Sequence, residues 1–285
     1  MRTLIRDMLR GLTVQVGRQV TMRTHSPRVV VLCYHSVHPS KTFGESPKLF
    51  EAHLTWLLEH CDVIRFRDAL SAAQRPRANR PAVAITFDDG YADNYEYAFP
   101  LLQRHGIPGT FLLTVGLMEK NPVVMARFRE LLQASDEDIR PLTWANVREM
   151  RDAGMEFGAH TYSHPNLARL DRARAGLELT RSREMMEQHL GERVTLTAYP
   201  FGTPKRSFTA ETLELTLMAG YEYAATVTFR SVRPTDSPLA IPRFSSPRCS
   251  VESLRNMIFG AWDLVGVWQE RAPLALQELV SPAKP

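Results

Sequence analysis

Apolar and polar positions follow a repeating order along this chain: a short, nearly unbroken apolar run, then a longer segment with one apolar face. Five apolar residues run without interruption over 29–33, which is typical of a strand buried on both faces. Further short runs predict strands at 82–87, 110–115, 156–159, 194–199 and 221–227, with a weaker one at 239–243. Segments with helical spacing of apolar residues lie between them, at 50–60, 95–105, 143–153, 167–190 and 211–219.

This alternation of strand and helix predicts parallel βα units. A closed or partly closed barrel and an open doubly wound sheet both satisfy it, and both collect their chemistry at the carboxyl ends of the strands. Because polar motifs follow the ends of several different runs, we favour the barrel. The expected fold class is α/β, a distorted (β/α) barrel of about seven parallel strands.

The chain is expected to divide into a basic N-terminal extension over 1–27, one α/β domain over 28–262 and a C-terminal tail over 263–285. The extension carries five arginines among leucine, isoleucine and methionine, with several apolar residues at helical spacing. It fits a helix packed on the domain, a basic amphipathic helix on an anionic membrane or a partner, or a disordered extension. Its charges interrupt any secretory signal, so the expected location is the cytoplasm or the inner face of the membrane.

Composition narrows the class of protein further. Of the 285 residues, 44% are hydrophobic and 23% charged, as is usual for soluble globular chains. The net charge of +4 is not concentrated in a basic run with interleaved aromatics, so we expect no nucleic-acid partner. The three cysteines are widely spaced and form no CxxC pair, which argues against a zinc knuckle or a disulfide framework.

Metal-binding side chains follow two of the predicted strands. Asp88 and Asp89 end one apolar run, and His160 and His164 follow another. Two imidazoles and one carboxylate make a three-ligand site with open positions, and the second carboxylate is then free to accept a proton from water. Each motif alone has an ordinary alternative, a turn for Asp-Asp-Gly and satisfied core residues for the histidines. The histidine spacing suggests one helical turn. Together the motifs indicate a metal-dependent hydrolase.

Three motifs resemble those of the polysaccharide deacetylases with the NodB homology domain, carbohydrate esterase family four. They are Thr-Phe-Asp-Asp-Gly at 86–90, His-Thr-Tyr-Ser-His at 160–164 and Ala-Tyr-Pro-Phe-Gly at 198–202, and the resemblance runs from about residue 29 to about residue 244. It implies the NodB type of distorted barrel and a divalent metal, usually zinc, with cobalt or nickel as alternatives. It also implies that Asp89, His160 and His164 ligate the metal, that Asp88 is the general base toward the attacking water, and that the backbone N–H of Phe201 helps to hold the oxyanion.

The chain departs from the family pattern in two places. Ala198 stands where many members have arginine, and no histidine follows His189, although the common late Leu-x-His element supplies the general acid. The Tyr-His pair at 34–35 is similar to a segment of the biofilm poly-N-acetylglucosamine deacetylases, the most similar subgroup, and this resemblance implies that His35 is the acid. A buried strand-end histidine is the alternative. Ile-Pro-Arg-Phe at 241–244 also resembles a late family element, in which Arg243 would orient Asp88, contact substrate or form a surface ion pair.

The expected activity is removal of an N-acetyl group from an amino sugar in a glycan or glycoconjugate, which would be the partner of this chain. A deacetylase or cyclic amide hydrolase acting on a small metabolite is a second hypothesis, and an inactive carbohydrate-binding module a third. Retention of Asp88 beside a complete ligand set argues against a pure binding module, because binding needs no base. The sequence does not predict an oligomeric state.

Overall fold

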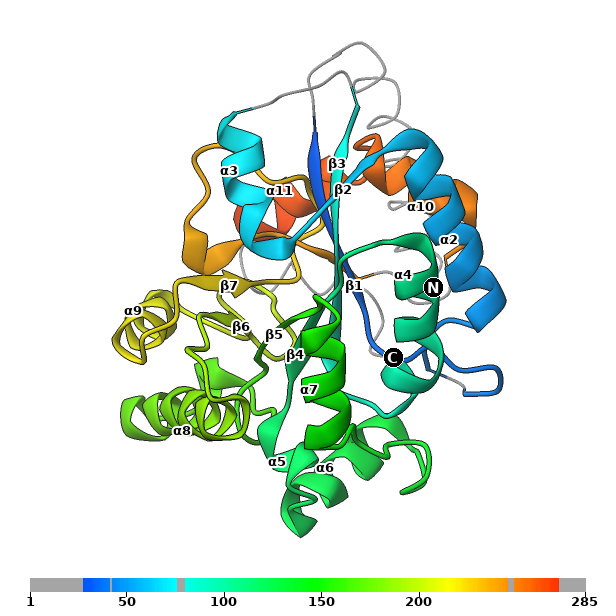
Figure 1. Cartoon of the computed structure of the whole chain (residues 1–285). Coiled ribbons are helices and arrows are strands. Elements are labelled where there is room, and N and C mark those ends of the chain that lie inside the picture. The colour runs from blue at the N-terminus through cyan, green and yellow to red at the C-terminus, as the bar shows by residue number, and fades with distance from the viewer. Residues whose placement is uncertain (1–27, 42, 76–79, 246–248, 272–285) are drawn as a thin grey trace, which may run out of the picture.

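The computed structural model describes residues 28–41, 43–75, 80–245 and 249–271 (Figure 1). The strands are β1 (Val29–Tyr34), β2 (Asp62–Ile64), β3 (Ala82–Asp89), β4 (Thr110–Leu113), β5 (Glu156–Ala159), β6 (Leu196–Ala198), β7 (Tyr223–Ala225) and β8 (Phe244–Ser245). The α-helices are α2 (Pro47–His60), α3 (Ala69–Gln74), α4 (Phe99–His105), α5 (Val115–Met118), α6 (Pro122–Leu132), α7 (Trp144–Asp152), α8 (Arg172–Leu190), α9 (Ala210–Met218), α10 (Val251–Ile258) and α11 (Asp263–Arg271).

The strands form one sheet in the order β7-β6-β5-β4-β3-β1-β8, with β2 also paired to β3, and every pairing between them is parallel. The sheet curves into a half-barrel with helices on its outside (Figure 1). All residues of β1, β4 and β5 are buried, as expected for strands covered on both faces. The predicted distorted barrel of parallel strands is therefore confirmed.

An aromatic column runs across the middle of the sheet and packs it against the helices. The ring of Phe87 on β3 stacks on that of Phe111 on β4 at 4.7 Å, and Phe111 lies 5.6 Å from Phe157 on β5. Each of these side chains is buried, and such burial contributes about 2–3 kcal/mol per phenylalanine. The column fixes the register of the strands that carry the acidic and histidine motifs.

Two expected elements differ from the structure. The weak strand expected at 239–243 is instead a short 3₁₀ turn at Pro238–Ala240, after which Ile241 bridges Ala225 and the strand β8 begins at Phe244. Proline at 238 and 242 removes two backbone donors, which explains the interruption. The helix expected at 167–190 begins at Arg172, because the Asp171 side chain caps it by accepting from the Arg174 N–H.

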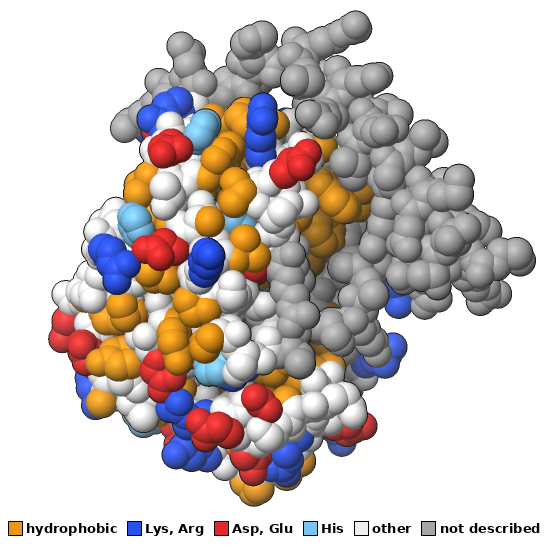
Figure 2. Space-filling view, turned by 90° about the vertical axis from the view of Figure 1, so that its right-hand side faces the viewer, with side chains coloured by type: hydrophobic (Ala, Val, Ile, Leu, Met, Phe, Trp, Pro, Cys, Tyr) orange, Lys and Arg blue, Asp and Glu red, His pale blue; other side chains and the backbone are white. Residues whose placement is uncertain are grey.

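The expected division into three regions stays a prediction. Its N-terminal extension, residues 1–27, lies outside the described residues. Residues 263–271 of the expected tail form α11, whose Asp263 pairs with Arg28. On the face shown in Figure 2, small groups of hydrophobic side chains lie between charged ones. In the part of the chain that the structure describes, no helix combines the length and apolar character that a membrane crossing requires.

The close contact between β5 and β6 predicts that Gly158→Ala destabilises the domain. A Cβ at Gly158 would lie 2.6 Å from the carbonyl oxygen of Leu196 and 2.7 Å from a methyl group of Leu112. We expect a loss of about 1–3 kcal/mol in the free energy of unfolding, measured by urea denaturation. Gly176→Ala is the control, since its Cβ would meet Leu215 at an ordinary 3.6 Å. It should be neutral or stabilising, and equal effects of the two substitutions would contradict the packing described.

Candidate active site

The functional residues expected from sequence meet at the carboxyl ends of the strands. Asp88 and Asp89 end β3, His160 follows β5 and His35 follows β1. Arg243 immediately precedes β8, which pairs with β1 on the side away from β3. The parallel sheet thus brings together side chains that lie up to 208 positions apart (243 minus 35) in the sequence.

The backbone at the histidine motif is a tight turn, so the predicted helical turn is wrong. Thr161 and His164 both have left-handed φ angles, 63° and 54°. Hydrogen bonds from α5 stabilise this turn. The N–H groups of Val115 and Gly116 donate to the carbonyls of Thr161 and Tyr162. The two imidazole rings nevertheless lie together, with centroids 4.9 Å apart. A helix was therefore not needed to bring the two histidines to one place.

Asp89 lies between the two histidines. Its Oδ1 is 3.6 Å from Nε2 of His164 and 3.9 Å from Nε2 of His160, while its backbone turns left-handed at φ 74°. The three side chains are buried, and one donor atom from each lies within 4.8 Å of the others. Distances of 3.6–3.9 Å are too long for hydrogen bonds, so these three donors converge without satisfying one another.

Both histidines are neutral near pH 7. Burial lowers the pKa of His160 to about 4, against the opposing effect of Asp88, and burial followed by the charge of His35 lowers the pKa of His164 to about 3. Their close approaches to the carboxylates are therefore not ion pairs. Nδ1 of His160 lies 3.0 Å from the Ala198 carbonyl, which can only accept, so the proton sits on Nδ1 and the Nε2 lone pair faces Asp89.

These residues fit a divalent cation. Two neutral imidazoles and a carboxylate are the donors of zinc sites that keep open positions, where ligand atoms about 2.1 Å from the metal lie roughly 3.4 Å apart. Burial raises the pKa of Asp89, so its charge is poorly compensated by the protein alone. Nδ1 of His164 is buried without a hydrogen-bond partner. A cation among the three donor atoms would compensate the carboxylate.

The neighbouring Asp88 has the opposite environment. Arg243 donates from Nη1 to Oδ1 at 2.7 Å and from Nη2 to Oδ2 at 2.8 Å, and both side chains are buried. Burial alone would raise the pKa of Asp88, but the charge and hydrogen bonds of Arg243 hold it well below its ordinary value. Arg243 is itself fixed by donating to Thr86 Oγ1 and to the Thr226 carbonyl. The surface ion pair considered for Arg243 is therefore wrong.

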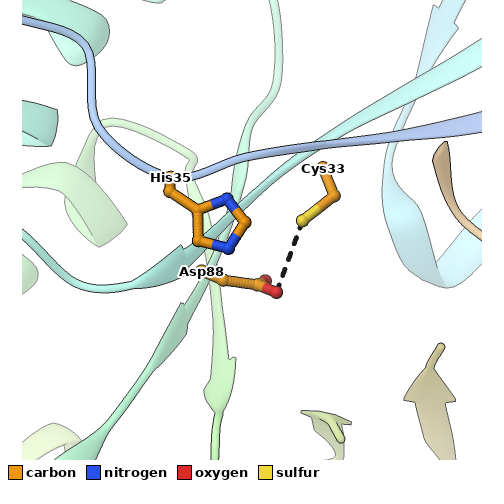
Figure 3. Close-up of side chains that lie close together, drawn as sticks. All are labelled: Cys33, His35 and Asp88. Atoms are coloured by element: carbon orange, nitrogen blue, oxygen red, sulfur yellow. Dashed lines mark hydrogen bonds between the residues drawn. The ribbon is translucent and has the colours of Figure 1, made fainter. Parts of the chain in front are cut away.

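His35 and Cys33 lie beside Asp88 (Figure 3). They are two residues apart at the end of β1, so their side chains share a face. The Cys33 thiol donates to Asp88 Oδ2 at 3.3 Å, and burial raises its pKa well above the ordinary value. His35 is half-buried, and its ring lies next to the Asp88 carboxylate in Figure 3. It is the more accessible of the two.

Phe201 lies at the rim of the site. Its φ is 63° and its side chain is 43% exposed, with the ring edge-on to His164 at a centroid distance of 5.0 Å. The left-handed turn continues through Gly202, where a Cβ would lie 2.4 Å from the Val227 nitrogen. Its role in holding an oxyanion stays a prediction.

Sequence reasoning did not assign roles to three residues that contact the aspartates or Arg243. Thr86 supports Arg243, Cys33 contacts Asp88, and the Tyr91 hydroxyl donates to Asp89 Oδ2 at 2.9 Å. The strand period could have found Thr86, which lies two residues before Asp88 on the same face of β3. Tyr91 follows a left-handed Asp89-Gly90 turn, whose direction no periodicity predicts.

The fold and the motifs at its strand ends define a family of hydrolases. A family profile described as "Polysaccharide deacetylase" matches residues 75–224, more than half of the chain. The chain belongs to the polysaccharide deacetylase family.

Particular relatives agree with this assignment. The chain is 27% identical over 209 residues to the protein YxkH of Bacillus subtilis, covering 72% of this chain and 67% of the relative. It is 24% identical over 214 residues to the poly-β-1,6-N-acetyl-D-glucosamine N-deacetylase of Staphylococcus aureus, covering 71% and 68%. Among solved structures, IcaB from Ammonifex degensii superposes with a TM-score of 0.66 at 25% identity, covering 83% of this chain and 97% of that one. The Streptococcus pyogenes deacetylase PplD has the same fold, with a TM-score of 0.67 at 22% identity, covering 82% and 99%.

The buried neutral histidines predict that the metal-free protein loses stability as the pH falls below about 6.5. In the unfolded chain each histidine binds a proton near that pH, whereas in the folded chain the pKa values are about 4 for His160 and about 3 for His164. The unfolded state therefore binds more protons inside this window, and each histidine lowers the free energy of unfolding by up to about 1.4 kcal/mol per pH unit. Above the window both states are neutral and the effect vanishes.

Urea denaturation of the metal-free chain at about pH 7.5 and about pH 5 measures this loss. His160→Gln and His164→Gln should each show a smaller drop than the unsubstituted chain. His53, whose pKa is also lowered by burial, titrates in all three proteins. An equal drop in all three would contradict the burial of neutral histidines at the site.

Proposed function

We propose that this protein is a metal-dependent N-deacetylase that removes the acetyl group from an N-acetylated amino sugar in a glycan or glycoconjugate. The observation that carries the proposal is the pair of neighbouring aspartates with opposite surroundings. Asp89 converges with two neutral histidines, while Asp88 is held ionised by Arg243. One carboxylate is thus available as a ligand and the other as a base.

The cation would be held by Asp89 Oδ1 and by Nε2 of His160 and of His164. Zinc suits imidazole nitrogen and carboxylate oxygen donors, and cobalt and nickel are the alternatives. When bound, such a cation supplies a Lewis acid that polarises the amide carbonyl and lowers the pKa of water.

Asp88 is the proposed general base. Its Oδ2 lies 3.7 Å from Nε2 of His160, so the carboxylate borders the ligand group directly. Arg243 binds both oxygens and fixes the plane of the carboxylate, so that it takes a proton from the attacking water without first reorienting. Its lowered pKa keeps it ionised over the whole neutral range.

His35 is the proposed general acid. Attack of water forms a new C–O bond at the amide carbon, and when the C–N bond then breaks, the acetyl group leaves as acetate while the nitrogen must gain a proton to leave as an amine. His35 lies beside Asp88 and is half-buried, so it can meet both solvent and the leaving group (Figure 3). The backbone N–H of Phe201 is the proposed donor to the developing oxyanion, because Phe201 lies next to His164 at the rim of the site.

The class of substrate is supported by the relatives. The Staphylococcus aureus relative is named for poly-β-1,6-N-acetyl-D-glucosamine, and the match covers most of this chain. We therefore propose a glycan or glycoconjugate that contains N-acetylglucosamine. Cyclic amides and simple carbohydrate binding are the competing hypotheses.

Acetate release tests the activity directly. A panel of N-acetylglucosamine oligomers, free N-acetylhexosamines, nucleotide sugars, lipid-linked sugars and one cyclic imide is incubated with metal-free protein and with protein reloaded with zinc, cobalt or nickel. We expect acetate from at least one amino-sugar substrate, and at least a roughly 100-fold loss after chelation that added metal restores. Absence of acetate from every N-acetylated sugar, with metal measured in the protein, would overturn the proposal.

His35→Gln tests the acid. With an N-acetylated sugar it should lower kcat by about 10²–10⁴-fold, because the amine leaves poorly without a proton. With an aryl acetate ester, whose leaving group departs as an anion, the loss should be under about tenfold. His38→Gln is the matched control, since that ring contacts Ser40 and Tyr97 and none of the proposed site residues among the described contacts. Equal losses on both substrates would argue that His35 has another role.

A further inference from the structure

The two oxygens of Asp89 have different partners. Oδ1 faces both imidazoles, at 3.6 Å from His164 Nε2 and 3.9 Å from His160 Nε2, and accepts a long hydrogen bond of 3.5 Å from the Thr114 hydroxyl. Oδ2 accepts a hydrogen bond of 2.9 Å from the Tyr91 hydroxyl. A phenol has one proton to donate, and here it is directed at the oxygen that the histidines do not face.

Tyr91 has little freedom to move away from Asp89. Its side chain is fully buried, and its ring lies 5.5 Å from the ring of Phe43 and 6.3 Å from that of Phe128. Its backbone forms an isolated antiparallel bridge with Pro141, on the segment that precedes α7. The hydroxyl is therefore fixed by packing, before any ligand is bound.

The same aromatic cluster also supports a second proposed metal ligand, His164. Tyr91, Phe128 and three aliphatic side chains form a small separate core beside the main one. Phe128, from α6, packs its ring against the imidazole of His164 at 5.2 Å. One satellite core thus holds both Asp89 and His164, which come from the ends of different strands.

We propose that Tyr91 is a positioning residue for the cation site: its hydroxyl holds Oδ2 of Asp89 and leaves Oδ1 as the single oxygen offered to the cation. This inference rests on the proposed cation site. Residues that hydrogen-bond to a metal-ligating side chain and orient it typically contribute about 10–100-fold in metal affinity. Loss of the Tyr91 hydroxyl should therefore weaken cation binding by that factor. Tyr91→Phe removes the hydroxyl and keeps the ring that packs on Phe43 and Phe128.

The test is the dissociation constant of zinc for the full chain, measured by competition with a chromophoric chelator. Tyr221→Phe is the matched control, because Tyr221 is buried and its hydroxyl donates to the Leu179 carbonyl, away from the donor atoms. We expect the Kd of Tyr91→Phe to rise about 10–100-fold and that of Tyr221→Phe to stay within about twofold. A Tyr91→Phe Kd within about twofold of the unsubstituted value overturns the inference.

Folding and the cation site are checked separately. The rise in unfolding midpoint on adding zinc reports the same difference in affinity even if one variant is less stable. The expected rise is smaller for Tyr91→Phe than for Tyr221→Phe, and equal rises would contradict the inference. If the unsubstituted chain itself binds no zinc, the proposed cation site fails, whereas binding by that chain with no effect of Tyr91→Phe removes the role of Tyr91 alone.

Discussion

The buried ion pair between Asp88 and Arg243 is the constraint on which the rest of the site depends. Two charges taken out of water are costly unless they pair with good geometry, and here the pairing is bidentate at 2.7 and 2.8 Å. The remaining donors of Arg243 reach Thr86 and the Thr226 carbonyl. The pair connects the central strand β3 to β8 at the edge of the sheet, and removal of either partner would leave an uncompensated charge inside the half-barrel.

This pair also separates the chemistry of two adjacent carboxylates. The guanidinium of Arg243 compensates the charge of Asp88 at every pH near neutrality. The side-chain contacts of Asp89 are with two neutral imidazoles, the Tyr91 phenol and the Thr114 hydroxyl, and burial raises its pKa. A dication beside Asp89 would compensate that charge. The change of direction between the two side chains comes from the backbone, which turns left-handed at Asp89 and Gly90 where β3 ends.

Much of this arrangement was predictable from the sequence, because apolar runs followed by polar motifs locate strand ends, and parallel strands bring those ends together. Asp88, Asp89 and His160 were placed in this way. Local backbone direction was not predictable: the helical turn expected at 160–164 is replaced by left-handed residues held by amides of α5. For the same reason the sequence did not predict that the Tyr91 hydroxyl donates a hydrogen bond to Asp89. The pairing of Arg243 with Asp88 spans 155 positions, and the resemblance to a late family element suggested it where periodicity could not.

The division of roles between Asp88 and Asp89 is tested most directly by measuring zinc content and acetate release in Asp88→Asn and Asp89→Asn side by side. The division of roles predicts that Asp89→Asn loses zinc, whereas Asp88→Asn retains one zinc per chain and loses turnover by about 10²-fold or more. Arg243 faces a neutral amide in Asp88→Asn, so folding of that variant is verified by its circular dichroism spectrum. Loss of zinc from folded Asp88→Asn with retention in Asp89→Asn, or unchanged turnover in Asp88→Asn, would contradict the assignment of ligand and base.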